Sequence, residues 1–521
     1  MIFSNSSTLL ALAISSLLAF NQGEACVVPT GINDGGIDFS DLQFPLPPGG
    51  IFGGLIQAAL PYISRYETPI LMRNTLGVVI GIYGAGSAFE DDALEFLGRM
   101  DVSEARRRCA GSNLFNEHRA VTLAYSNVWH AMEFAPASTN DVIAEATKWN
   151  LDLNICDNQD CSDITTPWGL AKSILEDTKG IFAVDGWNAD GSLSSTFNRV
   201  PFSDWRSNPY EPNLNNKKSW KPLQETDGLG FVFNQQHVTP HIGETARSYF
   251  LGDEDVCSRK LDNPKYKYAA EAELVLGRTA ALDDITKAQV EFFDSKLTSV
   301  VPFQAQYYIR SGVILDSWEF IVSDTVAIAT IYESIIVSWK EKVRHDAIRP
   351  TTWIHENLKD EIVISYQGPS EGMTGPIPAS EWQPYIRVMP HAEYPSGSSC
   401  LCTAFANAQI AWTGIDDFTS VIGGPLVATV PAGSSKYEQN QPSQDINLTY
   451  SSWTEMAQKC GESRLDGGMH FTDAVPDGEE VCGSIGLTVV DYFRDLVAGF
   501  TPLNAVPIEE ALTVPNESRN C

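Results

Sequence analysis

The chain has 521 residues, of which 43% are hydrophobic and 19% are charged, and its formal net charge is -31. This length admits one large core or two to three ordinary domains, and the composition is that of a globular protein. The acidic balance argues against nucleic acids and anionic membrane surfaces as partners. An anionic ligand would therefore have to be attracted by a local group of basic side chains.

The N-terminus has the pattern of a signal peptide, which we assign to residues 1–25. An apolar run over residues 8–20 is too short to span a bilayer comfortably, and small residues follow at Gly23 and Ala25. A buried N-terminal helix is the alternative interpretation. No later apolar run is long enough to predict a membrane helix. We therefore expect a secreted protein without a membrane segment.

All ten cysteines follow the predicted cleavage point. An even number in a secreted chain permits disulfides, although their pairing cannot be read from the sequence. Two Asn-x-Ser/Thr motifs, beginning at Asn447 and Asn516, predict surface glycosylation sites.

The N-terminal half, residues 26–260, is predicted to be mainly helical. Apolar and small residues recur there at helical spacing over residues 76–100, 116–134, 138–150 and 166–182. Residues 186–242 are rich in Trp, Pro and Asn, which predicts an irregular layer packed over the helices. Within this layer His237 and His241 have a spacing seen in metal sites on helices. Pro240 disfavours a regular helix, so a core or surface pair is the preferred interpretation.

The C-terminal half, residues 261–521, continues the helical pattern. Helical spacing resumes at residue 264 and is dense over residues 284–297, 324–348 and 484–497, whereas residues 423–452 form a polar excursion. Strand-like alternation is scarce throughout. We therefore predict an all-α fold of helical bundles with long irregular covering loops.

A lysine ends the apolar stripe of the predicted helix 324–348. The stripe comprises Ile328, Ile331, Ile335, Trp339 and Lys342. Lysine is seldom buried without a partner, so Lys342 either extends to water or meets a buried anion. Taken alone, extension to water is favoured.

Three short segments carry groups suited to binding an oxyanion. In the first, Lys342 and Arg349 are two helical turns apart, and Pro350 places the arginine near a helix end. The second, Pro395-Ser396-Gly397-Ser398-Ser399, predicts a helix start with free N–H groups. The third has Arg464 and, beyond a Gly-Gly bend, His470. Of these groups, only an imidazole can bond covalently to the central atom of the anion.

In this order, the segments resemble the pattern Lys-x6-Arg-Pro, Pro-Ser-Gly-His, Ser-Arg-x5-His of vanadium-dependent haloperoxidases and the type 2 phosphatidic acid phosphatase superfamily. The specific resemblance covers residues 325–475, and the length of the chain resembles the haloperoxidase branch more. It implies an all-helical fold with vanadate as cofactor, and hydrogen peroxide, a halide and a small organic molecule as substrates. By this resemblance His470 would ligate vanadium. The vanadate oxygens would be held by Lys342, Arg349, Ser396, Gly397 and Arg464.

The chain departs from the family pattern at Ser398, where the pattern has the histidine that acts as an acid or base. His391 and His345 are the candidates to take that role, although an ordinary structural histidine is the preferred interpretation of each. Trp339 is placed like a family residue of the halide pocket, but core packing is favoured. Asp473 either orients His470 or caps the following segment.

Three functions remain open from the sequence. The first is a secreted vanadate-dependent haloperoxidase that forms a hypohalous acid equivalent. The second is an acid-phosphatase-type hydrolase with His470 as nucleophile, which the loss of the histidine at position 398 weakens more. The third is a non-catalytic oxyanion-binding protein. The sequence predicts no oligomeric state.

Overall fold

The computed structural model describes residues 66–96, 115–148, 151–194, 200–226, 229–311, 317–519 and 521. The predicted signal peptide, together with Cys26 and Cys109, lies outside the described residues.

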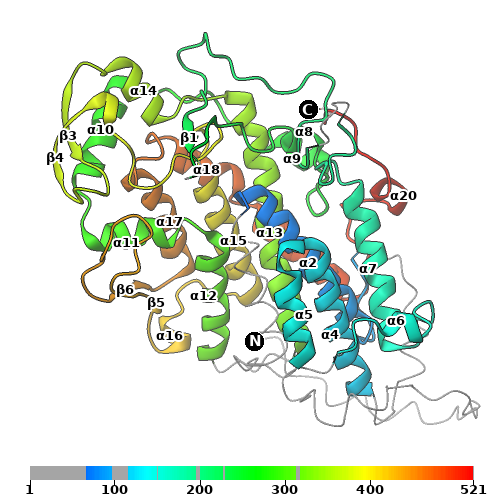
Figure 1. Ribbon diagram of the computed structural model, residues 1–521. Helices are drawn as coiled ribbons and strands as arrows, with labels where there is room; N and C mark the ends of the chain where they lie inside the picture. Colours follow the sequence, from blue (N-terminus) through cyan, green and yellow to red (C-terminus); the bar gives the residue numbers. More distant parts are fainter. Residues whose placement is uncertain are drawn as a thin grey trace, which may run out of the picture.

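One long helix, α13 (Ser317–His345), runs through the middle of the molecule and separates two groups of helices (Figure 1). It packs on one side against α2 and on the other against α15. The first group contains α2 (Thr68–Ser87), α4 (Phe115–Phe134) and α7 (Pro167–Ala183). The second contains α15 (Gly397–Thr413), α17 (Trp453–Asp466), α18 (Ala474–Cys482) and α19 (Ile485–Val497).

The remaining helices lie around these two groups (Figure 1). Beside the first lie α5 (Thr139–Lys148), α6 (Ile155–Asn158), α8 (Ile242–Thr245), α9 (Asp253–Ser258) and α20 (Ile508–Ala511). Beside the second lie α10 (Tyr268–Ala280), α11 (Asp284–Phe292), α12 (Lys296–Ser311), α14 (Pro350–Asn357) and α16 (Thr419–Ile422). The largest core cluster draws side chains from both halves of the chain.

Helix α13 is central because it is apolar nearly all round, which is typical of a helix buried on every side. Among the described helices, α13 is the one whose length and composition would allow it to cross a membrane. Of its most apolar stretch of 18 residues, 89% is buried inside the protein. It begins seven residues earlier than predicted and ends at His345, after which Asp346 adopts a φ of 46°.

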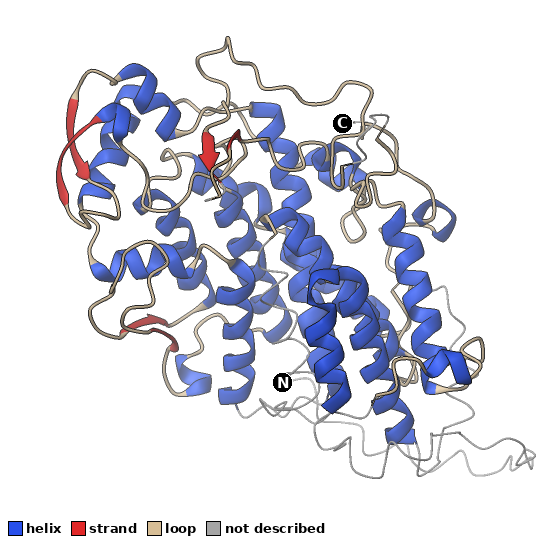
Figure 2. Ribbon diagram, viewed as in Figure 1, coloured by secondary structure: helices blue, strands red, loops and turns tan. Residues whose placement is uncertain are grey.

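Figure 2 shows how few strands accompany the helices. In the described part of the chain, three antiparallel hairpins pair β1 (Gln224–Thr226) with β2 (Val232–Asn234), β3 (Ile362–Tyr366) with β4 (Thr374–Pro378), and β5 (Leu426–Val430) with β6 (Ile446–Tyr450). In the first hairpin, Glu225 lies opposite Phe233. The all-α prediction is therefore confirmed, although the sequence did not reveal these hairpins.

Two predicted helix boundaries are wrong. The helix predicted over residues 76–100 begins at Thr68, where Pro69 suits the first turn, and ends at Ser87. The pattern over residues 284–297 is divided between α11 and α12, which begins at Lys296. This division brings Lys296 into the site described below.

Four disulfides join described residues: Cys156–Cys161, Cys257–Cys521, Cys400–Cys482 and Cys402–Cys460. The last two attach the start of α15 to α18 and α17. Each closes a loop of more than 50 residues, which in the chain-entropy model stabilises the folded state by about 4 kcal/mol.

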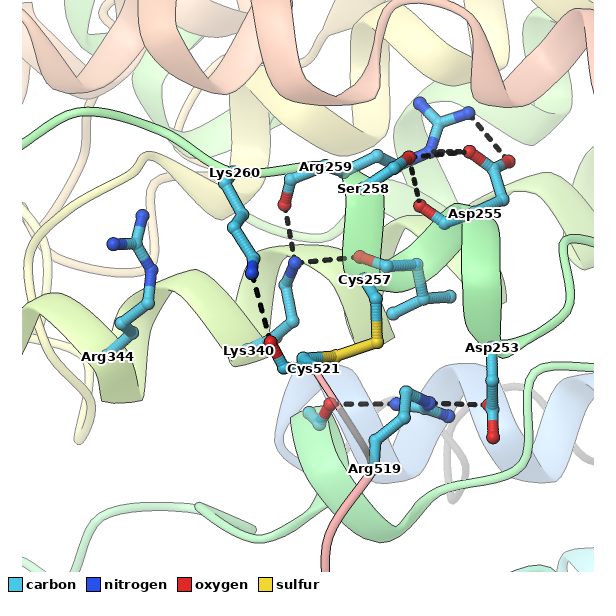
Figure 3. The surroundings of a disulfide bond; sticks show 12 residues. Asp253, Asp255, Cys257, Ser258, Arg259, Lys260, Lys340, Arg344, Arg519 and Cys521 are labelled. Carbon is cyan, nitrogen blue, oxygen red and sulfur yellow. Dashed lines mark hydrogen bonds and ion pairs between the residues drawn. A yellow bond between two sulfur atoms is a disulfide. The ribbon is translucent and has the colours of Figure 1, made fainter.

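The C-terminal residue is held beside α9 and α13 (Figure 3). In addition to the disulfide of Cys521, Lys260 donates a hydrogen bond to the Cys521 carbonyl at 3.1 Å. Arg519 pairs with Asp253 through a 2.5 Å contact. Arg519 and Cys521 are thereby fixed to α9.

Candidate active site

The three segments predicted from the sequence meet at one small pocket of about 50 Å³, which we call the oxyanion pocket. Its volume accommodates a few water-sized groups, the scale of a tetrahedral oxyanion. It is lined by Glu67, Thr68, Pro69, Asp294, Lys296, Trp339, Arg349, Met389, His391, Gly397, Ser398, Leu401, Arg464, Met469 and His470. The structure therefore brings five predicted residues to the lining: Arg349, Gly397, Ser398, Arg464 and His470.

Ser396 and Lys342 lie beside this lining. The Ser396 hydroxyl is the N-cap of α15 and accepts a hydrogen bond from the Ser399 N–H at 3.3 Å. A Cβ added to Gly397 would lie 3.6 Å from Lys342 Cε, which places the lysine against the start of the same helix. Gly414 ends α15 at a φ of 74°, a left-handed conformation that glycine adopts readily.

Lys342 does not extend to water. Its side chain is fully buried, and its ammonium group donates to the backbone carbonyls of Ala392 and Glu393 at 2.9 and 3.1 Å, and also to that of Pro395. Burial, reinforced by Arg349, lowers the pKa of Lys342 well below its usual value. The sequence-based preference for solvent exposure is therefore wrong, because the loop before α15 offers carbonyls in place of water.

Arg349 does not continue the face of α13. It is the N-cap of a new helix, α14, with extended backbone angles that the following Pro350 favours. Its guanidinium donates to the carbonyls of His391 at 2.9 Å and Met469 at 3.0 Å. Burial lowers its pKa to about 10. Arg349 thus reaches the pocket from a second helix start, and not along the stripe of α13.

Arg464 lies in the last turn of α17. Its Nη1 donates to the Phe293 carbonyl at 3.0 Å, while Nη2 has no hydrogen-bond partner within the described part of the chain. The nearest carboxylate oxygen, from Asp294, is 3.9 Å from this Nη2. An unsatisfied buried guanidinium nitrogen facing a pocket is the kind of donor that a bound oxyanion would satisfy.

Lys296, the first residue of α12, is a pocket residue that the sequence interpretation missed. It is buried, and it donates to the Phe293 carbonyl that Arg464 also uses. Burial lowers its pKa well below the usual value, and Arg464 lowers it further. Residues 292–296 belong to the looser part of the family resemblance, which gave this lysine no role, and the predicted helix over residues 284–297 ran across it.

His470 follows the predicted bend, in which Gly468 has a φ of 77°. Its Nδ1 lies 3.0 Å from Oε1 of Glu393, an oxygen that also accepts the Phe471 N–H at 3.0 Å. The Tyr266 hydroxyl donates to the other Glu393 oxygen at 3.1 Å. Because Nδ1 is engaged, Nε2 is the ring nitrogen left for a ligand in the pocket. Burial lowers the pKa of His470 well below the usual value, which favours neutral imidazole.

Glu393, not Asp473, is therefore the carboxylate that contacts His470. Asp473 lies at the N-cap of α18. Glu393 is fully buried, and this burial raises its pKa to about 7 against the opposing effect of Arg349 and Lys342. No local motif distinguishes Glu393 from other glutamates, and its role follows from the packing alone.

Of the two histidines proposed to replace the missing one at position 398, only His391 lines the pocket, beside Ser398. Its Nδ1 lies 3.0 Å from Nη2 of Arg349, and its ring centroid is 4.9 Å from that of Trp339. His345 instead lies 3.4 Å from Glu341 and 3.0 Å from the Asn263 side chain. For Trp339 the sequence left two alternatives, core packing and a place in the pocket. The side chain does both, since it is buried in the core and also lines the pocket.

His237 and His241 both form hydrogen bonds with backbone groups, and the described residues contain no cluster of three or more His, Cys, Asp or Glu side chains suited to a metal ion. His237 Nε2 accepts the Ala392 N–H at 3.3 Å, and His241 donates to the Trp187 carbonyl at the same distance. Both rings are buried, so the prediction of a core pair is confirmed.

Four buried cationic side chains gather at the pocket, each no more than 5% exposed: Lys296, Lys342, Arg349 and Arg464. The nearby carboxylates are Asp294, Glu393 and Glu67, of which Glu67 is paired with Arg387. In a chain with a net charge of -31, this arrangement provides the local basic group that an anion requires. The donors and the Nε2 of His470 fit vanadate as well as phosphate.

Comparisons with known proteins agree with this reading. Residues 324–499 match the family model described as the VCPO second helical-bundle domain. A holo-type bacterial vanadium-dependent chloroperoxidase aligns at 22% identity and a TM-score of 0.73, covering 83% of this chain and 93% of its own. The chain therefore has the fold of the vanadium-dependent haloperoxidases, and its C-terminal half carries their second helical-bundle domain. The apo-type bacterial vanadium-dependent chloroperoxidase aligns at 20% identity and a TM-score of 0.71, covering 83% of this chain and 94% of its own.

The vanadium haloperoxidase fold also includes a bacterial vanadium-dependent iodoperoxidase, which matches at 13% identity and a TM-score of 0.56 and covers 85% of this chain and 95% of its own. No curated protein sequence matches the chain. The segment matched by the family model carries all seven site residues predicted from the sequence. Lys296 lies before this segment.

Proposed function

We propose that the protein is a vanadate-dependent haloperoxidase, which uses hydrogen peroxide to oxidise a halide to a hypohalous acid equivalent that halogenates a small organic molecule. The observation that carries the proposal is the convergence of Lys296, Arg349, Arg464 and His470 on a pocket of oxyanion size, with the buried Lys342 behind them. A pentavalent oxyanion needs many hydrogen-bond donors and one protein ligand, and not a cage of several ligating residues.

Each residue has a specific task in this proposal. His470 Nε2 would be the vanadium ligand, held in the right tautomer by Glu393. Arg349, Arg464, Lys296 and the N–H groups at the start of α15 would hold the oxygens, with Lys342 close behind. When bound, vanadate supplies the centre that activates hydrogen peroxide. His391 would take or return a proton in place of the histidine absent at position 398.

Export of the chain is part of the same proposal. Four disulfides among the described residues fit an oxidising compartment, and residues 1–25 have the composition of a signal peptide. The similar solved structures are named as chloro- and iodoperoxidases, but at 13–22% identity they support the scaffold and do not identify the halide.

A phosphatase-type hydrolase is the second candidate, because the same donors would fit a phosphoryl group in transfer. It requires an acid near the leaving group, and Ser398 occupies the place at which the family pattern supplies one. A protein that binds the oxyanion without catalysis is the third candidate.

One set of assays separates the three functions. Purified protein, with and without orthovanadate, is tested for peroxide-dependent bromination of phenol red and for hydrolysis of p-nitrophenyl phosphate. We expect bromination only with vanadate. Vanadate-independent phosphate hydrolysis without bromination would refute the proposal, and vanadate binding without either activity would favour the third function. His470→Ala should abolish stoichiometric vanadate binding while the thermal unfolding midpoint stays within a few degrees of wild type.

A further inference from the structure

A second, larger cavity of about 660 Å³ lies beside the oxyanion pocket. We call it the lateral groove and define it by Ile70, Phe202, Tyr210, Phe233, Val238 and Pro390, which are among its lining residues. Its volume falls within the range of cavities that bind small organic molecules, about 300–1,000 Å³. The oxyanion pocket, at about 50 Å³, is too small for such a molecule. The two cavities therefore suit ligands of different size.

The lateral groove and the oxyanion pocket are adjacent. Glu67 lines both cavities. Between them, Trp339 Nε1 donates to the Val238 carbonyl at 3.0 Å, and the Val238 N–H donates to the Pro390 carbonyl at 2.9 Å. Val238 and Pro390 line the groove, whereas Trp339 and His391 line the pocket. A molecule in the groove would thus lie one layer of residues from the pocket, or in direct contact with it past Glu67.

The charges that line the lateral groove are paired among the described residues. Arg387 contacts Glu67 at 2.7 Å and Glu225 at 2.9 Å. Asp204 is paired with Arg206 at 2.7 Å. Burial lowers the pKa of His237 to about 3, which keeps that ring neutral. A neutral ligand fits this lining better than an ion, because an ion would have to displace one of these partners.

Aromatic side chains at the groove remain accessible. Phe233 on β2 lines the groove and is 47% exposed, although a phenylalanine in a monomeric protein is usually buried. Its neighbours Phe231 and Val232 on the same hairpin are 70% and 68% exposed. Exposed apolar groups gathered at a cavity mark a binding surface more often than scattered ones do. Aromatic rings at such a surface favour a flat aromatic ligand.

We propose that the lateral groove binds a neutral aromatic molecule and presents it to the oxyanion pocket. The use of this molecule as the halogen acceptor rests on the proposed function, whereas its binding does not. In that use, the hypohalous acid equivalent forms a carbon–halogen bond and the ring C–H bond breaks. The released proton combines with hydroxide to give water, so that the aromatic carbon is oxidised and the halogen reduced.

Binding is tested with 2-naphthol and vanadate-free protein by isothermal titration calorimetry. The variants are Phe233→Ala, Ile70→Ala and, as a matched control on the same hairpin, Phe231→Ala, which does not alter the groove lining. We expect saturable binding of one molecule, weakened about tenfold by Phe233→Ala, weakened also by Ile70→Ala and unchanged by Phe231→Ala. Vanadate affinity should be the same in all four proteins.

Equal loss in Phe231→Ala and Phe233→Ala, or no saturable binding by wild type, would overturn the lateral groove as a site. The Ile70→Ala variant keeps the test valid if Phe233→Ala does not fold. Naphthol binding without any vanadate-dependent bromination of phenol red would refute the proposed function alone. Bromination of phenol red without saturable naphthol binding would refute the lateral groove alone.

Discussion

Oε1 of Glu393 lies 3.0 Å from Nδ1 of His470, across 77 residues of sequence. The same oxygen accepts the N–H of Phe471, so the carboxylate fixes both the ring and the backbone beside it. A histidine held in this way has one tautomer and one orientation, which are the two properties that a metal ligand requires.

We predict that Glu393→Gln lowers the affinity for vanadate about 10- to 100-fold, because the amide keeps an acceptor oxygen but loses the charge that selects the Nδ1–H tautomer. Equilibrium dialysis with vanadium analysis measures the affinity. Asp473→Asn is the matched control and should leave the affinity unchanged. An equal loss in both variants would show that neither carboxylate has a specific role.

Lys296→Met should weaken vanadate binding and at the same time stabilise the vanadate-free protein. The loss in affinity is expected to be about tenfold or more, since a hydrogen bond to a charged group contributes about 1.5–3 kcal/mol. The gain in the free energy of unfolding is expected to be about 1–2 kcal/mol, because a buried charge without a close carboxylate partner is removed. Calorimetry and urea unfolding measure the two quantities.

Lys287→Met provides the contrast. Lys287 is also buried, but it forms a 2.8 Å ion pair with the buried Glu438. Its replacement should destabilise the protein by about 3 kcal/mol without changing vanadate affinity, because it leaves a carboxylate unpaired. Destabilisation by both substitutions would contradict a ligand-binding role for Lys296.

His391→Gln should lower bromination turnover about 100-fold if His391 transfers the proton, while vanadate remains bound. His345→Gln should leave turnover unchanged, since His345 does not line the pocket. Ser398→His, added to His391→Gln, should restore part of the rate. Steady-state assays across pH measure these effects, and full activity of His391→Gln would assign the proton transfer to another group.

The disulfide between Cys402 and Cys460 ties the start of α15 to α17, which carries Arg464. Replacement of both cysteines by serine should lower the free energy of unfolding by about 2–4 kcal/mol. It should also weaken vanadate binding, because the donors of the two helices would no longer be held in register. Guanidinium unfolding and dialysis measure these effects, and unchanged vanadate affinity would show that packing alone aligns the helices.

We predict that Glu341 makes the free energy of unfolding depend on pH in the acidic range. Burial raises its pKa, but hydrogen bonds from His345, Arg344 and Leu261 outweigh that effect and lower the pKa to about 2. Because the folded pKa is depressed, its stabilisation is present above about pH 4.5 and is lost as the pH falls toward 2. The gap in unfolding free energy between wild type and Glu341→Gln should be about 2–3 kcal/mol at pH 7 and should narrow below pH 4.5. A gap independent of pH would contradict this assignment.

Much of the donor set could be predicted because its signals are local. Ser396 caps the helix that the serines predicted, and the Gly-Gly pair bends the chain between Arg464 and His470. An all-helical fold also followed from the sequence, since residues such as Ile328 and Ile335 recur at helical spacing and are buried together.

The division between α13 and α14 depended on contacts remote in sequence. An Arg-Pro pair is compatible with the end of one helix or with the start of the next. Here the backbone of residues 346–348 forms hydrogen bonds with a segment that is remote in sequence. Trp220 donates to the Asp346 carbonyl, and Ile348 donates to that of Lys218, each at 2.8 Å. Arg349 therefore enters the pocket from α14.

The surroundings of the donors likewise come from tertiary packing. Local patterns identify a lysine, an arginine or a histidine as able to bind an anion, because capping and bends are properties of a few consecutive residues. Glu393, Lys296 and the lateral groove belong to the site through burial and long-range contact, which no local pattern encodes. Lys342 illustrates both levels, since its place on the apolar stripe is visible in the sequence but its three carbonyl partners arise only when the loop before α15 folds over it.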